Sequence, residues 1–396
     1  MPRIHTDILV AGGGIAGLSA CAAFASAGFS VMMASPEEPV TDSATPGSDL
    51  RSTAFLQPAK VLFEKIGLWD HMAPTATPLD GLRIVDSIGT PPEVRATRDF
   101  RASDILDGPF GWNIPNWQTL RTLSHALAGR TGVTLRTGTS FVSMVQRDQE
   151  VISRLSDGSS VVSRLVVGAD GRNSTVRQDA GIDVRTTRYG QKALAFVVGH
   201  HVPHENVSTE IYNEGGPFTM VPLPDQNGQP ASAVVWMNPG AKAQSLFTLA
   251  QSDFERVASE RSCHWFGPLT LLSARRMWPI ISQRATSLTA QRAVILAEAA
   301  HVVPPIGAQG LNTSLNDIAA LYDALADVSD PGSEAVLARY SKARAGDIAR
   351  RVAAIDLFNR ITKSGLPALQ SLRLGGLKAL HDTAPLRRAT MRAGMG

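Results

Sequence analysis

A glycine-rich turn near the N-terminus constrains the fold of this chain more than any other feature. Gly12, Gly14 and Gly17 form a G-x-G-x-x-G pattern between an apolar stretch at 7–11 and an alanine-rich stretch. A second apolar stretch, 29–34, completes a strand–helix–strand unit. The first glycine permits a tight turn, the second leaves room for a pyrophosphate, and the third allows close helix–strand packing. This context predicts dinucleotide binding at a helix N-terminus.

The same region imitates a membrane span, because residues 8–36 contain no charged side chain. Five glycines interrupt this run, and the dinucleotide turn explains their spacing. Only Arg3 supplies positive charge before the run, and Asp7 adjoins it, which is not typical of a signal peptide. We therefore expect neither a membrane span nor an export signal here.

Composition restricts the remaining classes. A chain of 396 residues with 43% hydrophobic and 18% charged residues has room for two or three domains and a large core. Two cysteines cannot form a disulfide framework, so we expect a cytoplasmic protein. A net charge of +3 is too weak to indicate a nucleic-acid partner.

Positive charge is concentrated at the C-terminal end. Residues 339–396 contain 12 Lys or Arg and 3 Asp, a net charge of +9. Apolar residues recur there at helical spacing, at Ile348, Val352, Ile355, Phe358 and Ile361. Two interpretations stay open. Either this face packs on the rest of the protein and the charges are solvated, or part of the surface docks on an anionic membrane or an acidic partner.

A second candidate site follows the apolar stretch 164–169. Asp170 stands at the expected carboxyl end of this strand and is followed by Gly171, a position that can reach a cofactor crevice. The alternative is that Asp170 only caps the next helix. One expected group is missing, because Ser35 stands where a ribose-binding carboxylate usually ends the second strand of such a unit.

Periodicity predicts the other elements. Alternating residues broken by Pro and Gly at 193–237 predict a second, mostly antiparallel sheet. We expect strands over 79–94, 133–136, 140–148, 164–169 and 293–296, and helices over 57–67, 117–129, 175–180 and 311–328.

These motifs, in this order, resemble the flavin-dependent aromatic hydroxylases of the para-hydroxybenzoate hydroxylase fold, and most closely the ubiquinone-biosynthesis hydroxylases. The matching segments are the Gly12/Gly14/Gly17 turn, Asp49-Leu50-Arg51, 168–172 and 305–312. The resemblance implies an α/β fold with a Rossmann-like FAD-binding domain, an inserted, mostly antiparallel substrate domain and C-terminal helices. The implied FAD-binding domain comprises 1–74, 105–180 and 272–338, the substrate domain 75–104 and 181–271, and the basic helical region 339–396.

The resemblance also implies a site. FAD is the cofactor and NAD(P)H the co-substrate. Glu298 stands where the family has the aspartate of a Gly-Asp pair, and Ala297 replaces the glycine. The cofactor-binding residues implied are Gly12, Gly14, Gly17, Arg51, Asn116, Arg121, Asp170, Glu298, Pro305, Gly307, Gly310, Leu311 and Asn312.

The implied activity is hydroxylation of an aromatic ring, that of a polyprenylated phenol, in ubiquinone biosynthesis. The partner is thus a hydrophobic aromatic substrate, and a lipid-binding tail would place the enzyme peripherally at the inner face of the membrane. No catalytic acid or base is assigned. Ile306, Phe196 and Phe218 are candidates for the substrate space or for ordinary core. His200, His201 and His204 lack the glutamate of H-E-x-x-H, so no metal is expected.

Two alternatives remain. Residues 110–115 differ by one residue from the W-x-W-x-I-P pattern of flavin-dependent halogenases, which leaves a halogenase or another flavin oxidoreductase open. Ser35 and Glu298 favour a third class, a flavin-free scaffold of a biosynthetic complex.

Overall fold

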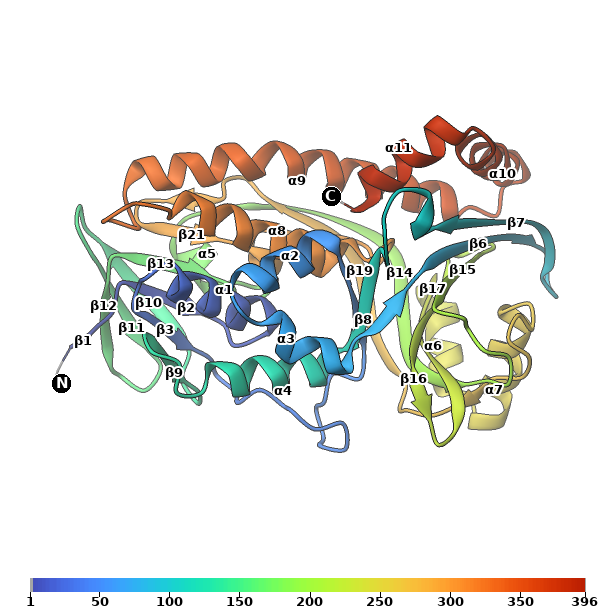
Figure 1. Ribbon diagram of the computed structural model, residues 1–396, viewed down its shortest axis with the longest axis horizontal. Coiled ribbons are helices and arrows are strands. Elements are labelled where there is room, and N and C mark those ends of the chain that lie inside the picture. Colours follow the sequence, from blue (N-terminus) through green and yellow to red (C-terminus); the bar gives the residue numbers. More distant parts are fainter. Residues whose placement is uncertain (1–2, 396) are drawn as a thin grey trace.

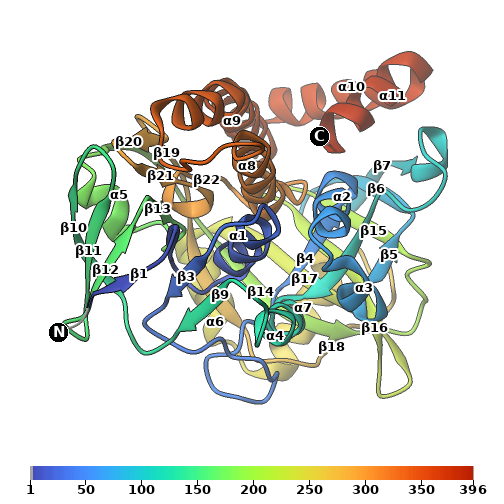
Figure 2. The same cartoon turned by 60° about the vertical axis from the view of Figure 1, so that its left-hand side comes forward.

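A six-stranded sheet carries the glycine-rich turn at its centre (Figures 1 and 2). The computed structural model describes residues 3–395. The strand order is β20-β21-β13-β2-β3-β9, and every neighbouring pair except β20–β21 is parallel. The strands expected within 7–11, 29–34, 164–169 and 293–296 all form, and they lie together in this sheet. Its strands are β2 (Ile8–Ala11), β3 (Val31–Ala34), β9 (Val133–Arg136), β13 (Leu165–Gly168), β20 (Thr289–Ala290) and β21 (Ala293–Ile295).

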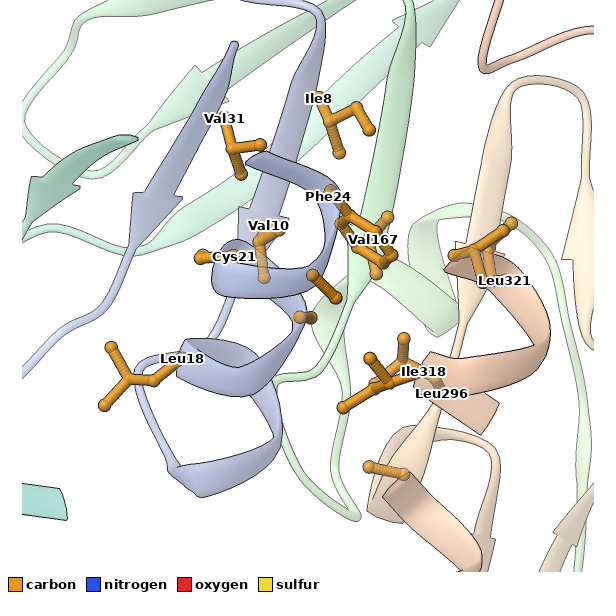
Figure 3. Packing of buried hydrophobic residues seen from close by; sticks show 14 of the residues in the cluster. Ile8, Val10, Leu18, Cys21, Phe24, Val31, Val167, Leu296, Ile318 and Leu321 are labelled. Atoms are coloured by element: carbon orange, nitrogen blue, oxygen red, sulfur yellow. The ribbon is translucent and has the colours of Figure 1, made fainter. Parts of the chain in front are cut away.

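Helices α1 (Ile15–Ser26) and α8 (Gln309–Ala324) pack against each other and against this sheet. Figure 3 shows Phe24 of α1 beside Val167 and Leu18 on the other side of the helix, with Ile318 and Leu321 of α8 in the same core. Because α1 is surrounded by the sheet, α8 and α4, it is apolar on nearly all sides rather than along one stripe. This packing brings the start of α1 and the start of α8 to the same part of the molecule.

A nine-stranded sheet forms the second half of the fold. Its order is β22-β19-β14-β17-β16-β15-β6-β7, with β18 paired to β14, and only the β15–β6 pair is parallel. The expected second, mostly antiparallel sheet is therefore confirmed. Its strands are β6 (Gly81–Ile88), β7 (Glu93–Arg101), β14 (Val184–Gly199), β15 (Val207–Tyr212), β16 (Phe218–Gln226), β17 (Gln229–Pro239), β18 (Thr270–Leu271), β19 (Arg276–Ala285) and β22 (His301–Val302).

One face of this sheet is covered by α6 (Gly240–Thr248) and α7 (Gln251–Arg261), which the sequence did not predict. The other face is turned toward the segment that leads into α8, because Ala193 and Met237 pack with Ile306. Strands β19 and β22 come from 272–338, the stretch assigned to the FAD-binding part, so both parts of the fold contribute to this sheet.

Two smaller sheets complete the β-structure, with orders β1-β12-β11-β10 and β4-β8-β5. Their strands are β1 (Ile4–His5), β4 (Ser52–Leu56), β5 (Thr77–Leu79), β8 (Gly111–Pro115), β10 (Phe141–Gln146), β11 (Val151–Leu155) and β12 (Ser160–Ser163). The remaining short helices are α2 (Gln57–Lys65), α3 (Trp69–Met72), α4 (Asn116–Leu127), α5 (Thr175–Asp179) and the 3-10 turns η1 (Ala73–Thr75), η2 (Ala102–Asp104) and η3 (Ala297–Ala299).

Three helices end the chain: α9 (Glu334–Thr362), α10 (Pro367–Asp382) and α11 (Ala384–Met395). Figure 1 shows α9 along one edge, with α10 and α11 beside β7. Ile348 and Ile355 of the predicted apolar stripe are buried, whereas Phe358 is 38% exposed. Within residues 3–395 we find no helix with both the length and the hydrophobicity needed to cross a bilayer.

Candidate functional site

The glycine turn between β2 and α1 has the shape of a phosphate cradle. A Cβ atom on Gly12 would lie 2.3 Å from the carbonyl oxygen of Ala169, and one on Gly17 would lie 1.9 Å from that of Gly12. A Cβ on Gly14 would meet no atom within 4 Å, so only this glycine faces open space. Helix α1 has no side-chain cap and no acidic residue in its first turn. Its first N–H groups are therefore available to an anion.

Asp170 lies beside this turn, and its two carboxylate oxygens differ in their hydrogen bonding. Oδ2 accepts hydrogen bonds from the backbone N–H groups of Thr175 (2.7 Å) and Val176 (3.1 Å) at the start of α5. Oδ1 is buried and makes no hydrogen bond within the described part of the chain. The helix-cap interpretation is thus correct for one oxygen, while the other is an unsatisfied acceptor, which a folded protein rarely leaves without a ligand or water.

Arg51 belongs to a polar cluster at the start of β4. Its Nε and Nη2 atoms lie 2.7 Å from the two carboxylate oxygens of Asp49, and its guanidinium stands 5.1 Å from the ring centroid of Trp278. Asn116 joins this cluster, because its Nδ2 donates to Asp49 (2.8 Å) and its Oδ1 accepts from Thr53 (2.7 Å). Arg121 lies further along α4, and its side chain is exposed.

Glu298 lies on the turn η3, where its side chain is exposed. Burial by itself lowers the pKa of Arg51, but the hydrogen bond and charge of Asp49, with the charge of Glu298, hold that pKa above its ordinary value. The residue that precedes Glu298 is Ala297, with a φ of +55°, a conformation that glycine adopts without cost.

The segment 305–312 forms the start of α8. Gly307 and Gly310 are exposed, while Pro305 and Leu311 are half-buried. The helix has no side-chain cap, and its first turn contains no acidic residue. Asn312 serves the fold, because its Oδ1 accepts from the N–H of Leu56 (2.9 Å) and its Nδ2 donates to the carbonyl groups of Ala54 and Ala308 (2.7 Å each). It thereby joins the start of α8 to β4.

The sequence family described as "FAD binding domain" matches residues 5–354. The chain belongs to this family. Among curated proteins, it is 31% identical to ubiquinone hydroxylase UbiL of Rhodospirillum rubrum over 395 residues, which covers 98% of this chain and 89% of UbiL. It is 27% identical to the 3-demethoxyubiquinol 3-hydroxylase of Escherichia coli over 401 residues, covering 100% of both.

Among solved structures, p-nitrophenol 4-monooxygenase PnpA from Pseudomonas putida superposes with a TM-score of 0.79 at 19% identity, covering 99% of this chain and 98% of PnpA. At this identity the likeness shows the fold. The predicted architecture, a Rossmann-like FAD-binding part with an inserted antiparallel sheet, is confirmed by this likeness and by the family.

The residues of this FAD binding domain family member fit a dinucleotide. The open space at Gly14, the unsatisfied Oδ1 of Asp170 and the uncapped starts of α1 and α8 each offer what such a ligand requires. Ser35 stands where the carboxylate is missing, and its hydroxyl proton is donated to the carbonyl group of Glu37 (2.9 Å).

Three buried or partly buried histidines, His200, His204 and His301, form hydrogen bonds within the protein. His301 Nε2 donates to Asp317 Oδ2 (2.6 Å), and His200 bonds the carbonyl group of Val202 and the hydroxyl of Ser232. His204 bonds the carbonyl group of Leu223. Among residues 3–395, no group of three or more His, Cys, Asp or Glu side chains is arranged to hold a metal ion.

The substrate-space candidates lie on opposite faces of the nine-stranded sheet. Ile306 packs with Ala193 and Trp278 on the face turned toward the start of α8. Of the two interpretations left open for Phe196 and Phe218, the structure supports ordinary core. Both are buried on the other face, in the core formed with α6 and α7. In an antiparallel sheet successive side chains alternate between faces, and Phe196 and Phe218 fall on the α6/α7 side.

A polar pair that the sequence analysis did not identify lies on the near face. The Tyr212 hydroxyl donates a hydrogen bond to Glu210 Oε2. Glu210 is only 6% exposed, and the backbone N–H of Gly307 also stabilises its carboxylate. Burial raises the pKa of Glu210 despite both donors. The sequence signal was a glutamate and a tyrosine two residues apart in one strand, which places both on one face.

A cavity of about 330 Å³ adjoins this face between β14, the end of α9 and the start of α10. Tyr189 belongs both to its lining and to the apolar cluster around Ile306. The other lining residues are Gly190, Gln191, Gly215, Pro239, Arg360, Lys363, Ser364 and Leu369.

Proposed function

We propose that this protein is an FAD-dependent hydroxylase that uses NAD(P)H and O2 to hydroxylate the ring of a polyprenylated phenol in ubiquinone biosynthesis. One observation carries the proposal. The similarity to ubiquinone hydroxylase UbiL extends over 98% of the chain, so it includes the substrate sheet as well as the cofactor turn. The fit of the chain's own residues to a dinucleotide supports the cofactor.

The cofactor-binding residues proposed from the sequence act in four groups. Gly12, Gly14 and Gly17 accommodate the pyrophosphate. Arg51 and Glu298 provide a charged clamp, with Asn116 orienting Asp49 and Arg121 further out on α4. Asp170 offers its unsatisfied oxygen. The segment containing Pro305, Gly307, Gly310, Leu311 and Asn312 presents the positive end of the α8 dipole, which favours negative charge on the group it faces.

When bound, FAD supplies the redox chemistry between NAD(P)H, O2 and the ring. The protein positions the ring and excludes water. Ala193, Trp278 and Ile306 provide an apolar wall for an aromatic ring. The Glu210–Tyr212 pair provides a polar end, where a phenolic O–H can donate to the carboxylate or accept from the tyrosine.

The domain division given by the resemblance stays part of this proposal. Residues 1–74, 105–180 and 272–338 form the FAD-binding part, 75–104 and 181–271 the substrate part, and 339–396 the C-terminal region. The dense pairing of β14 with β19 joins the first two parts through one continuous ribbon.

We further propose that the C-terminal helices contact an anionic lipid surface at the inner face of the membrane. Lys378, Arg388 and Arg392 are exposed, as are Leu372 and Leu386. The helix pair is also close to the cofactor segment, because Gln309 Nε2 donates to the carbonyl group of Gly394 (2.9 Å). A lipid surface at this location would supply a substrate that is nearly insoluble in water.

The test is direct. The purified protein should be yellow, with a flavin absorbance spectrum, and should consume NADH or NADPH faster when a short-chain polyprenyl phenol is added in detergent. Mass spectrometry should find a product that is heavier by one oxygen atom. Colourless protein that fails to bind added FAD would favour the scaffold alternative instead.

The halogenase alternative rested on residues 110–115. In the structure these residues contribute to a strand and to side-chain packing. They lie largely in β8, where Trp112 packs on Trp69 with ring centroids 4.9 Å apart, and Asn113 donates to the carbonyl group of Pro222 (2.8 Å). A second set of reactions with chloride or bromide, yielding no halogenated product, would close this alternative.

A further inference from the structure

We propose that Asp317 is a positioning residue for FAD: it holds the turn η3 in the conformation that presents Glu298 to the cofactor site. Asp317 lies on α8 and is completely buried. Its Oδ2 accepts from the backbone N–H of Ala297 (3.0 Å) and bonds His301 Nε2 (2.6 Å). Its Oδ1 accepts from Arg344 Nε (2.8 Å). One carboxylate therefore connects η3, β22, α8 and α9.

The turn needs such a restraint because of Ala297. Its φ of +55° lies in the left-handed region, which is unfavourable for every residue with a Cβ. A strained residue persists only where its surroundings over-determine it. On one side, Leu296 is bonded to Gly168 of β13 (3.0 Å), and on the other, the N–H of Ala300 donates to the carbonyl group of Ala297 (2.9 Å). The bond from Ala297 N–H to Asp317 is the side-chain contact that fixes the strained residue itself.

The conformation of Ala297 determines where the next side chain points. Glu298 extends outward from η3 and is close enough to Arg51 to contribute to its pKa. Asp317 does not itself face this region, since its oxygens are engaged by three partners in the interior. Its effect on a cofactor is therefore indirect, through the turn.

The carboxylate is suited to this task because it is charged and fully partnered. Burial alone raises the pKa of Asp317, but His301 and Arg344 outweigh burial and hold the pKa below its ordinary value. Asparagine at 317 would keep the size but would offer one oxygen to three donors. The bond to Ala297 would then compete with the bonds to His301 and Arg344.

This inference rests on the proposed FAD function, and the experiment separates the two. Apo-protein is titrated with FAD, and the dissociation constant is obtained from flavin fluorescence for the parent, Asp317→Asn, Ala297→Gly and the double variant. Asp317→Asn should weaken FAD binding by about five- to thirtyfold, the range that the cost of a left-handed residue gives. In the Ala297→Gly background, where this conformation costs nothing, the same change should weaken binding much less.

Asp347→Asn is the matched control. It removes another carboxylate from Arg344, which Asp347 binds at 2.7 Å, without touching η3, and should leave FAD affinity unchanged. A parent that does not bind FAD would overturn the proposed function. The positioning role is wrong if the parent binds FAD and Asp317→Asn does not weaken that binding. It is also wrong if Asp317→Asn weakens FAD binding equally with Ala297 and with Gly at position 297.

A measurement on the unmodified apo-protein guards against variants that fail to fold. The Ala297 amide should exchange its hydrogen as slowly as amides of the surrounding core, because Asp317 engages it in the interior. Exchange as fast as in an exposed turn would show that the bond does not restrain the turn and would overturn the inference.

Discussion

Arg51 and Asp49 form a bidentate ion pair at the candidate cofactor site, with both nitrogen–oxygen distances at 2.7 Å. The pair explains why the two residues occur two positions apart in one motif. Asp49 fixes the plane of the guanidinium and engages Nε and Nη2, so Nη1 is the nitrogen that remains to face a ligand. Since Asn116 also donates to Asp49, the pair is itself held in place.

Arg51→Ala should weaken FAD binding by about 1.5–3 kcal/mol, the usual contribution of a charge-assisted hydrogen bond, or roughly 10- to 150-fold. Fluorescence titration of apo-protein measures this. Arg147→Ala removes an arginine paired with Glu150 on the β10–β11 turn and should leave the dissociation constant unchanged. Equal affinity of Arg51→Ala and the parent would show that this motif does not serve the cofactor.

Gly14→Ala should lower the affinity for FAD, whereas Gly17→Ala should lower the stability of the protein. A Cβ at Gly14 meets no protein atom, so the apo-protein should keep its thermal stability while FAD affinity falls. A Cβ at Gly17 would collide with the backbone of Gly12, so this variant should lose several degrees in melting temperature or fail to fold. Thermal melts of apo-protein and FAD titrations distinguish the two. If Gly14→Ala binds FAD as tightly as the parent, the pyrophosphate does not bind at this turn.

The parts of the fold that could be predicted were those specified by neighbouring residues. The glycine turn, the strands around it and the carboxylate of Asp170 follow from short patterns, and the structure bears out the strands. The neighbouring residues do not show whether one oxygen of Asp170 lacks a hydrogen-bond donor, because this depends on how α5 packs against β13.

Other features depended on contacts between distant residues. The sequence left open whether Phe196 and Phe218 line the substrate space or belong to the core, because alternation divides a strand into two faces without saying which face meets the cofactor. The sequence showed the positive charge of the C-terminal region but not its partners, and in the structure Arg373 pairs with Asp86 and Arg387 with Asp104, far away in the sequence. Only a folded chain reveals such partners.

Ala308→Gly should stabilise the protein by about 1 kcal/mol, because Ala308 at the start of α8 has a φ of +56° that glycine adopts without strain. Urea denaturation of apo-protein measures the change. Ala319→Gly is the control within the same helix, where loss of helix propensity should destabilise by about 1 kcal/mol. If both variants are destabilised alike, Ala308 is not held in the left-handed conformation.

Glu210 should make stability depend on pH. Burial raises its pKa above 4.5, so the folded protein binds more protons than the unfolded chain as pH rises above that value, and stability falls. Glu210→Gln has no carboxyl group to ionise at this position, so it should not lose stability for this reason as pH rises. Its stability relative to the parent should therefore increase between pH 4 and pH 7.5 in urea unfolding of apo-protein. Glu93→Gln, on an exposed side chain, should show no such trend. A difference that is constant with pH would mean that Glu210 is as easily ionised as an exposed glutamate.

The lipid-contact proposal predicts binding to vesicles that depends on charge. Lys378, Arg388 and Arg392 are exposed, whereas Arg387 is engaged by Asp104 and by the carbonyl group of His381. The informative variant is therefore Lys378→Ser with Arg388→Ser and Arg392→Ser, leaving Arg387 in place. Each basic residue near an anionic surface contributes about 1 kcal/mol, so the parent should float with phosphatidylglycerol vesicles and the triple variant should not.

Three exposed arginines outside the C-terminal helices, Arg154, Arg185 and Arg188, provide a control of equal charge when changed together to serine. That control should still float, and vesicles of phosphatidylcholine alone should recover little of either protein. If only the basic residues bind the vesicles, binding should be lost when the salt concentration is raised, because salt screens interactions between charges. Exposed Leu372 and Leu386 predict that some binding survives salt once the helices have docked. Flotation that is absent, or indifferent to lipid charge and to the triple variant, would assign the tail a purely structural role, with its arginines serving to hold α10 and α11 against the substrate sheet.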